Sequence, residues 1–480
     1  MPLASFTVVI TVVFLLSVHT LTSVYQDIGR HIRLGQIIWE THRVPATNLF
    51  SYTAPDFPFV NHHWLSEVLL YLGDRLVGLQ GLVAIKAALL TLAFGLAFAA
   101  RWRREIAWPA VLIGLSAAVI LIERTDVRPE ILSYVFLGWF LFVLYRYPRS
   151  WLVWTLPVIQ LLWVNAHIYF FMGPFVFIAW WLGEGAQHGV GVFKSRRMWF
   201  LAGLLAIATL LNPHGLQGAL YPLRVFNDYG YSVLENKSPH FLAAFGYPQL
   251  TSQVFYVGIA LSVLCFSANR RRIRENMFGL IIVSITAAMA LGMVRNFGLF
   301  ALCMLSPALK NLGEMDNHSH THWPLRQWIF AWCVLFVMSI VTKQFYGQYG
   351  APYRQFGFVV PRGFEEPIAF YRSAGIHGPI FNNFDIGSYL IWKLPEEPVF
   401  VDGRPEAYPA SFFTDVYIPM QTDPEAWREF AERYHINAII WDYGDITPWS
   451  QAFVSRIRRD PTWKTVYDAQ SVMILVRKTR

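Results

Sequence analysis

The chain has 480 residues, of which 55% are hydrophobic and only 15% are charged, and its mean hydropathy is +0.37. Soluble domains carry roughly 25% charged residues, so this composition argues against an ordinary soluble protein and predicts a membrane protein. The net charge is +8, but the basic residues lie in short loops and not on a face with interleaved aromatic residues, so nucleic acid is not an expected partner.

Long apolar stretches alternate with short polar loops over residues 1–343, which we predict to form one helical transmembrane domain. Stretches of about 17–22 residues suffice for a helix to cross a hydrocarbon core of ~30 Å. The first stretch, residues 2–21, lacks the basic start and the A-x-A-like cleavage site of a secretory signal, so we expect an uncleaved span. In total the sequence predicts about eleven transmembrane helices, at 4–23, 80–100, 107–122, 131–146, 150–166, 168–185, 198–211, 251–268, 277–294, 297–310 and 327–343.

Basic residues gather in alternate loops of this domain, and the positive-inside rule assigns those loops to the cytoplasm. An odd number of spans then puts the N-terminus in the cytoplasm and the C-terminal tail outside it. The first outer loop, 24–79, carries four arginines of its own, but long loops follow the rule poorly, so the assignment stands. The cytoplasmic clusters are Arg101, Arg103 and Arg104; Arg146 and Arg149; Lys194, Arg196 and Arg197; and Arg270, Arg271, Arg272 and Arg274.

Polar residues collect at the outer ends of the predicted spans and in three long outer segments. These segments are 24–79, with an amphipathic interfacial helix at 64–79, then 212–250, and the tail from about 344. Ionisable groups at membrane depth are costly, so they indicate a site or a pathway, although each could instead lie in headgroups and water. The residues are Asp27, His31, His62, His63, Glu67, Glu123, Asp126, Arg128, Glu130, Asn165, His167, Asn212, His214, Glu235 and Arg295.

The tail, residues 344–480, changes character and reads as an extracytoplasmic α/β domain behind a linker marked by Pro352 and Pro361. Strand-length apolar runs alternate with helical patterns along it. The predicted strands are 379–384, 399–402, 438–443 and 472–476, and the predicted helices are 363–374, 424–435 and 448–459.

Short motifs recur from the first loop to the tail, and together they carry a resemblance to a known superfamily. They are Asp27-Ile-Gly-Arg-His31, Asn61-His-His-Trp-Leu-Ser-Glu67, Arg128-Pro-Glu130, Trp163-Val-Asn-Ala-His167, Asn212-Pro-His-Gly215, Phe381-Asn-Asn-Phe-Asp-Ile-Gly-Ser-Tyr-Leu390 and Val399-Phe-Val-Asp-Gly-Arg404. This pattern resembles the polytopic GT-C glycosyltransferases, which include the oligosaccharyltransferase catalytic subunit and the protein O-mannosyltransferases. It is more closely similar to a largely uncharacterised bacterial branch, although Glu235-Asn236 stands where that branch would have Glu-Trp.

The resemblance implies that the enzyme takes a sugar from a polyprenyl-phosphate-linked donor at the outer face of the cytoplasmic membrane. Such a transfer needs a base for the acceptor proton, and the resemblance makes Asp27 that base; the alternative is a solvated carboxylate at a helix end. His31, His63, Glu67 and His167 belong to the same motifs and are expected to bind substrate, or else simply to form hydrogen bonds.

The departing phosphate needs a counter-charge, and Arg128 and Arg295 are the candidates because a guanidinium matches phosphate oxygens with two parallel donors. Snorkelling towards lipid headgroups is the alternative for both. Asp126 and Glu130, near Glu123, could share a Mg²⁺ or Mn²⁺ ion. The interleaved Arg124 and Arg128 could instead neutralise these acids, and members of the superfamily that use monophosphate carriers resemble cases without a required metal.

In the tail, Asp402 and Arg404 follow a predicted strand, so they could recognise an acceptor or pair with each other. The resemblance implies a glycosyltransferase that uses a polyprenyl-phosphate-linked sugar and an extracytoplasmic glycan, lipid or protein acceptor. Membrane lipid is the other expected partner. Two other classes fit the same architecture: a non-catalytic scaffold that binds polyprenyl sugars, and a lipid or sugar transporter. A transporter would more often show internal repeats, and the sequence has no convincing repeat.

Overall fold

A computed structural model describes residues 2–21, 27–103, 106–226, 229–246, 250–315, 356–358, 360 and 364–478. The chain divides into two compact units, each described by itself. The helical unit comprises Met1–Leu21, Leu79–Pro222 and Val233–Val359, and the mixed unit comprises Thr22–Gly78, Leu223–Ser232 and Val360–Arg480. The first loop thus belongs to the same unit as the tail. The sequence instead predicts that it is part of a transmembrane domain that ends at residue 343. The predicted span 327–343 and both linker prolines lie outside the described residues.

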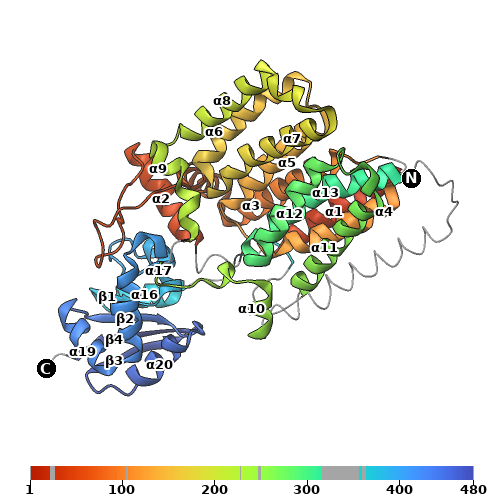
Figure 1. The fold of residues 1–480 in the computed structure, drawn as a ribbon. Helices are drawn as coiled ribbons and strands as arrows, with labels where there is room; N and C mark the ends of the chain where they lie inside the picture. Colours follow the sequence, from red (N-terminus) through yellow and green to blue (C-terminus); the bar gives the residue numbers. More distant parts are fainter. Residues whose placement is uncertain are drawn as a thin grey trace. The chain divides into compact units, whose positions relative to one another are not determined.

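The helical unit is built from apolar helices that occupy the predicted stretches up to residue 310. Helices α1, α4, α11, α12 and α13 pack side by side, and α6 packs against α5 and α8 (Figure 1). The helices are α1 (Pro2–Ser17), α3 (Trp64–Ala99), α4 (Ala107–Leu121), α5 (Glu130–Arg146), α6 (Leu156–Ala166), α7 (Met172–His188), α8 (Arg196–Leu210), α9 (Gly215–Ala219), α10 (Pro239–Ala244), α11 (Leu250–Ala268), α12 (Met277–Gly292) and α13 (Phe297–Met315). Short 3₁₀ segments between them include η2 (Ile122–Arg124), η3 (Trp151–Thr155), η4 (Ile168–Phe171), η7 (Leu234–Asn236) and η9 (Val294–Asn296).

Helix α3 contains both the predicted interfacial helix and the second predicted span. Its backbone leaves the helical conformation at Gly78, where φ is 67° and ψ is 177°. Only glycine adopts such angles without strain, so the sequence itself marks the break between the two parts. Further along, Gly138 lets α5 approach α3 closely, since a Cβ atom there would lie 2.5 Å from the carbonyl oxygen of Ala93.

Three helices of the described chain are long and apolar enough to cross a membrane: Trp64–Ala99, Ile168–His188 and Leu250–Ala268. Shorter apolar helices cover Phe6–Ser17, Trp151–Ala166 and Met277–Gly292. These helices support a membrane location, but the predicted number of about eleven crossings is not confirmed. The reason is length, because several of the expected spans form helices of only 11–17 residues in the structure.

The mixed unit combines the first loop with a four-stranded sheet in the order β1-β2-β4-β3 (Figure 1, blue). Strands β1 and β2 are parallel, and the β2–β4 and β4–β3 pairs are antiparallel. The strands are β1 (Ile380–Asn382), β2 (Ala438–Asp442), β3 (Trp463–Ala469) and β4 (Val472–Arg477). The helices are α2 (Ile28–Thr41), the first part of α3, α16 (Glu365–Ser373), α17 (Phe384–Lys393), the π-helical η13 (Phe412–Tyr417), α18 (Ile418–Thr422), α19 (Pro424–Arg433) and α20 (Pro448–Ile457).

The core of this unit is aromatic. Phe381 on β1 contacts the rings of Phe400, Trp427, Trp441 and Phe453, with centroid separations of 4.8–5.3 Å. Aromatic pairs at this distance stabilise a core beyond their burial alone. Such packing fixes the end of β1, and with it the start of α17, in a defined place.

In the tail, one predicted strand is wrong and two elements were missed. Residues 399–402 do not form a strand, because Val399 makes only a single bridge, to Ser51 of the first loop. The sequence also missed β3 and α17. Most side chains of β3 are exposed, so it lacks a continuous apolar run, and α17 is too short for its periodicity to stand out from a strand.

Candidate functional site

The predicted base, Asp27, lies at the N-terminus of α2 in the mixed unit. Its carboxylate does not cap the helix, and one of its oxygens lies 3.8 Å from Nη2 of Arg30, one turn further on. Two glycines let α2 approach its neighbours. A Cβ atom at Gly35 would overlap the carbonyl of Glu67 on α3, and one at Gly29 would lie 2.9 Å from Cβ of Trp392 on α17.

The close approach of α2 and α3 builds a buried hydrogen-bond network around Glu67, which is fully buried. His31 Nδ1 lies 3.0 Å from Glu67 Oε1, and Asn61 Nδ2 donates to Glu67 Oε2 over 2.7 Å. Arg30 Nη2 lies 3.3 Å from His31 Nε2. Because arginine has only donors, Nε2 accepts, and the neutral His31 ring donates from Nδ1 to Glu67.

Electrostatics favour the same protonation state. Burial and the neighbouring Arg30 guanidinium lower the pKa of His31, and the hydrogen bond to Glu67 opposes them only in part. His63 joins the group through its ring, whose centroid lies 5.6 Å from that of His31. The structure therefore brings together Asp27, His31, His63 and Glu67 from two separate motifs, and their roles stay predictions.

Two further members of this cluster, Arg30 and Asn61, were not predicted. Both lie inside the motifs that the sequence singled out, Arg30 one residue before His31 and Asn61 six before Glu67. The only indication in the sequence was a polar side chain at a helix end. From an arginine or an asparagine alone, a buried hydrogen-bonding partner cannot be distinguished from a surface residue.

A second carboxylate, Asp385, belongs to the same region of the mixed unit. It lies in the first turn of α17, the helix that packs against α2. Burial and the nearby carboxylates of Asp445, Asp27 and Asp442 raise the pKa of Asp385 to about 7. Within the described chain its carboxylate has no hydrogen bond or ion pair, so nothing offsets the repulsion. The residue lies in a motif noted from the sequence, but only the folded packing of α17 on α2 shows its neighbours.

Replacing Asp385 by asparagine is expected to stabilise the mixed unit at alkaline pH. Between pH 3.8 and about 7 the unfolded carboxyl loses its proton while the folded one keeps it, so wild-type stability falls as the pH rises through this window. Because the side chain is partly exposed, we expect a gain of about 2 kcal/mol at pH 8 and a smaller gain at pH 5. Thermal unfolding midpoints at both pH values check this, with the exposed Asp415→Asn as control; equal gains at both would contradict it.

A separate cluster lies in the helical unit, where two arginines converge on Glu235 of η7. Glu235 Oε2 accepts from Arg124 Nη1 over 2.6 Å and from Arg128 Nη1 over 2.7 Å. Arg124 Nη2 also donates to Glu130 Oε2 over 2.8 Å. The third arginine, Arg295 in η9, donates to Asn236, the residue after Glu235, over 2.9 Å. This arrangement is named the arginine cluster below.

The arginine cluster is rich in positive charge. Burial alone would raise the pKa of Glu235, but Arg124, Arg128 and Arg295 lower it well below its usual value. The Nε atoms of Arg124 and Arg295 are buried and have no hydrogen-bond partner among the described residues. Since buried donors are nearly always satisfied, these two N–H groups are suited to donate hydrogen bonds to an anionic ligand.

The sequence predicted Arg128 and Arg295 but did not select Arg124 or Glu235. Glu235 had been noted only as a polar residue at an outer helix end, and Arg124 only as a residue that could neutralise the neighbouring acids. The pairing joins residues 107 to 111 positions apart, which no local motif reports.

His167 lies near this cluster, and its side chain binds the backbone of the following segment. Its Nδ1 accepts from the backbone N–H of Tyr169 and lies 2.9 Å from Ser133 Oγ, which in turn accepts from Trp163 Nε1. The ring thereby caps η4, and the hydroxyl of Tyr169 donates to the carbonyl of Arg295 over 3.1 Å. His167 thus supports the residues next to Arg295.

Asp126 and Glu130 are the acids predicted to bind a metal ion. Asp126 and Glu130 are both buried, and Glu130 is ion-paired with Arg124, whose guanidinium also holds Glu235. Among the described residues no group of three or more histidine, cysteine, aspartate or glutamate side chains is arranged to hold a metal ion. Because the Glu130 carboxylate is already paired with Arg124, it is less suited to bind Mg²⁺ or Mn²⁺, and a metal site at Asp126 and Glu130 stays a prediction.

Asp402 and Arg404 form a buried ion pair in the mixed unit, with 0% and 1% of their side chains exposed. Arg404 donates from Nε and Nη2 to the two oxygens of Asp402, each over 2.7 Å, and from Nη2 to Asn48 Oδ1 over 2.8 Å. Burial would raise the pKa of Asp402, but Arg404 lowers it. These contacts join the first loop to the tail and favour the structural alternative; acceptor recognition stays a prediction.

No protein-family model and no curated protein sequence matches the chain. Solved structures that resemble it include two of an archaeal oligosaccharyltransferase. The archaeal oligosaccharyltransferase AglB from Archaeoglobus fulgidus, in complex with an inhibitory peptide and a dolichol-phosphate, aligns with a TM-score of 0.53 and 11% identity, over 94% of this chain and 70% of that one. The apo form of the Archaeoglobus fulgidus oligosaccharyltransferase aligns with a TM-score of 0.54 and 12% identity, over 94% and 71%. The chain therefore has the GT-C-like fold of these proteins, whereas the resemblance to a bacterial branch stays a prediction.

Proposed function

We propose that this chain is a GT-C-type glycosyltransferase that moves a sugar from a polyprenyl-phosphate-linked donor to an acceptor outside the cytoplasmic membrane. The observation that carries the proposal is the arginine cluster, in which Arg124 and Arg128 converge on Glu235 with Arg295 nearby. The fold supports the class of enzyme, because a protein that shares it is described as an oligosaccharyltransferase in complex with a dolichol-phosphate.

The arginine cluster is suited to a phosphate because guanidinium groups present planar pairs of N–H donors to anionic oxygens. Glu235 holds Arg124 and Arg128 in fixed orientations, and the unpartnered Nε atoms of Arg124 and Arg295 supply donors not used by the protein. A phosphate in this place would gain charge as the sugar leaves, and fixed donors stabilise such charge most strongly in the transition state.

Asp27 is the proposed base. The acceptor's nucleophile forms a bond to the anomeric carbon and passes its proton to the Asp27 carboxylate, while the bond from that carbon to the phosphate oxygen breaks. The electron pair of that bond leaves with the polyprenyl phosphate, which the arginine cluster stabilises. Arg30 lies 3.8 Å from Asp27 and is held in turn by the His31–Glu67 network, so this network positions the base. In this proposal the N-terminus is cytoplasmic and the tail extracytoplasmic.

The test is incubation of the purified chain with a panel of radiolabelled polyprenyl-phosphate sugars and candidate acceptors. If the chain is a transferase, the labelled donor should be consumed and polyprenyl phosphate should appear. A scaffold would bind donor without consuming it, and a transporter reconstituted in vesicles would move the donor or sugar across the membrane unchanged. Either of the latter results would overturn the proposal.

A further inference from the structure

Three arginines line a polar pocket of about 330 Å³ in the helical unit, where the C-terminal ends of α3 and α5 lie. They are Arg101, Arg103 and Arg146, and Tyr145 and Tyr147 complete the wall. The Arg101 guanidinium lies 5.3 Å from the ring centroid of Tyr145, whose side chain is buried. A buried aromatic support of this kind holds the guanidinium in one orientation.

The charge in this pocket is not neutralised by the described residues. None of the three arginines has a hydrogen bond or ion pair there, and the buried Nε of Arg101 has no partner. Glu314, an acid whose charge acts on Arg101, is paired with Lys310 over 3.8 Å and accepts from Asn276 over 3.0 Å. Burial lowers the pKa of Arg101, and the adjacent Arg103 and Arg146 add to this effect, although Tyr145 and Glu314 oppose it.

Helix dipoles are the main opposing effect. Arginines are often found at helix C-termini because each terminus carries a partial charge of roughly −0.5. Two termini therefore supply about −1, against three full positive charges, so the pocket keeps a net positive charge of about +2. That surplus favours an anion.

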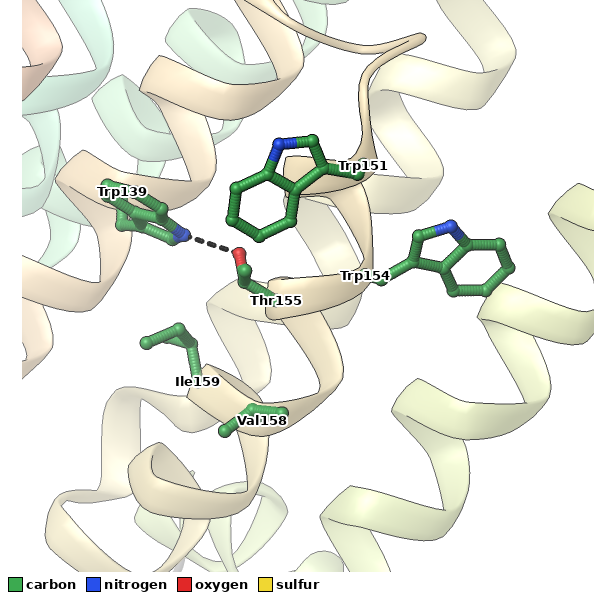
Figure 2. Close-up of a pocket in the computed structure, with 6 residues that line it drawn as sticks. All are labelled: Trp139, Trp151, Trp154, Thr155, Val158 and Ile159. Atoms are coloured by element: carbon green, nitrogen blue, oxygen red, sulfur yellow. Dashed lines mark hydrogen bonds between the residues drawn. The ribbon is translucent and has the colours of Figure 1, made fainter.

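An apolar groove of about 430 Å³ lies along the same helix, α5, and its neighbour α6. Figure 2 shows Trp139, Trp151 and Trp154 around Thr155, with Val158 and Ile159 below them. Trp139 Nε1 donates to Thr155 Oγ1 over 2.8 Å, so its one polar group is satisfied within the groove. Trp151 is 72% exposed, and tryptophan is enriched at membrane–water interfaces.

The groove and the arginine pocket are parts of one surface. Trp139 and Arg146 are seven residues apart on α5, which puts them on one side of the helix and about 10 Å apart along its axis. Phe142 joins them, because its ring lies 6.0 Å from Trp139 and 5.4 Å from Tyr147. The polar arginine pocket thus continues into the apolar groove, just as the charged headgroup of an amphiphile continues into its apolar tail.

We propose that the pocket and the groove together bind one anionic membrane phospholipid, with its phosphate among the three arginines and an acyl chain along the tryptophans. Basic pockets between membrane helices commonly hold such headgroups. The proposed donor site is a different place: Glu130, which pairs with Arg124, and Arg146 are at opposite ends of α5, about 24 Å apart along the helix.

Native mass spectrometry of the detergent-solubilised chain tests this, with dioleoyl phosphatidylglycerol, dioleoyl phosphatidylcholine and polyprenyl phosphate as probes. We expect phosphatidylglycerol to bind at least about tenfold more tightly than phosphatidylcholine. Arg103→Gln with Arg146→Gln, both exposed side chains, should remove that preference, and Trp151→Ala should weaken retention of both phospholipids. Arg271→Gln, an exposed arginine of the loop between α11 and α12, is the matched control and should change nothing.

Four outcomes would overturn the inference: equal retention of both phospholipids, an equal effect of the pocket variants and Arg271→Gln, preferred retention of polyprenyl phosphate, or displacement of the lipid by equimolar inorganic phosphate. The last would assign the pocket to free phosphate. The readout is lipid retention, so it does not depend on the transferase reaction.

Discussion

Asp27→Asn is expected to lower donor turnover by about 10²- to 10⁴-fold while leaving donor affinity unchanged, because it removes a general base and keeps the shape of the side chain. The amide cannot take the acceptor's proton. It can still occupy the space at the start of α2 beside Arg30, so the His31–Glu67 network should persist. Turnover measured with saturating donor, together with equilibrium donor binding, separates the two quantities.

The matched control for this experiment is Asp56→Asn, which removes an exposed carboxylate from the same loop. It should leave both turnover and affinity unchanged. If Asp27→Asn turned over donor as fast as Asp56→Asn does, Asp27 would have no part in the mechanism. If donor affinity fell together with turnover, Asp27 would be a binding residue and not the base.

Arg404→Met is expected to cost the mixed unit about 3–5 kcal/mol, because it leaves the buried Asp402 carboxylate without its partner. The variant also loses the hydrogen bond to Asn48 and the contact of the guanidinium with Phe59, whose ring centroid lies 4.8 Å away. These contacts tie the first loop to the tail. The free energy of unfolding is measured by denaturant titration, with the protease resistance of residues 364–478 as the readout.

An exposed arginine–carboxylate pair in the same unit supplies the comparison. Arg433 and Glu429 also lie 2.7 Å apart, but each side chain is 60% exposed, so Arg433→Met should cost less than about 0.5 kcal/mol. The double change Asp402→Asn with Arg404→Met should recover part of the loss, since no isolated charge remains. Similar costs for Arg404→Met and Arg433→Met would show that the buried pair does not hold the unit together.

The helices of the helical unit could be predicted because each is a long apolar run between polar loops. Hydropathy found α4, α5, α11 and α12 to within a few residues. It could not give the number of crossings, because several helices are shorter than a hydrocarbon core requires. In the tail, β2 and β4 were found from their buried apolar runs, while the exposed β3 was missed.

The candidate sites were predictable where one motif supplied several members. Asp27 and His31 share one motif, and Glu67 follows in the next, so the close approach of α2 and α3 had only to bring two segments together. The partners of Glu235 and Asp385 come from distant segments, and the sequence alone does not report which helices pack. The resemblance to the bacterial branch even argued against a role for Glu235, because Asn236 follows it where that branch would have tryptophan. In the structure that residue, Asn236, binds Arg295.

Donor binding by the arginine cluster is tested by the affinity of the chain for a polyprenyl-phosphate sugar in three forms: wild type, Arg295→Gln and the control Arg271→Gln. We expect a dissociation constant about ten- to a hundredfold higher for Arg295→Gln alone, since a charge-assisted hydrogen bond to phosphate is lost. Equal affinities for all three would contradict this expectation and would remove the arginine cluster from donor binding.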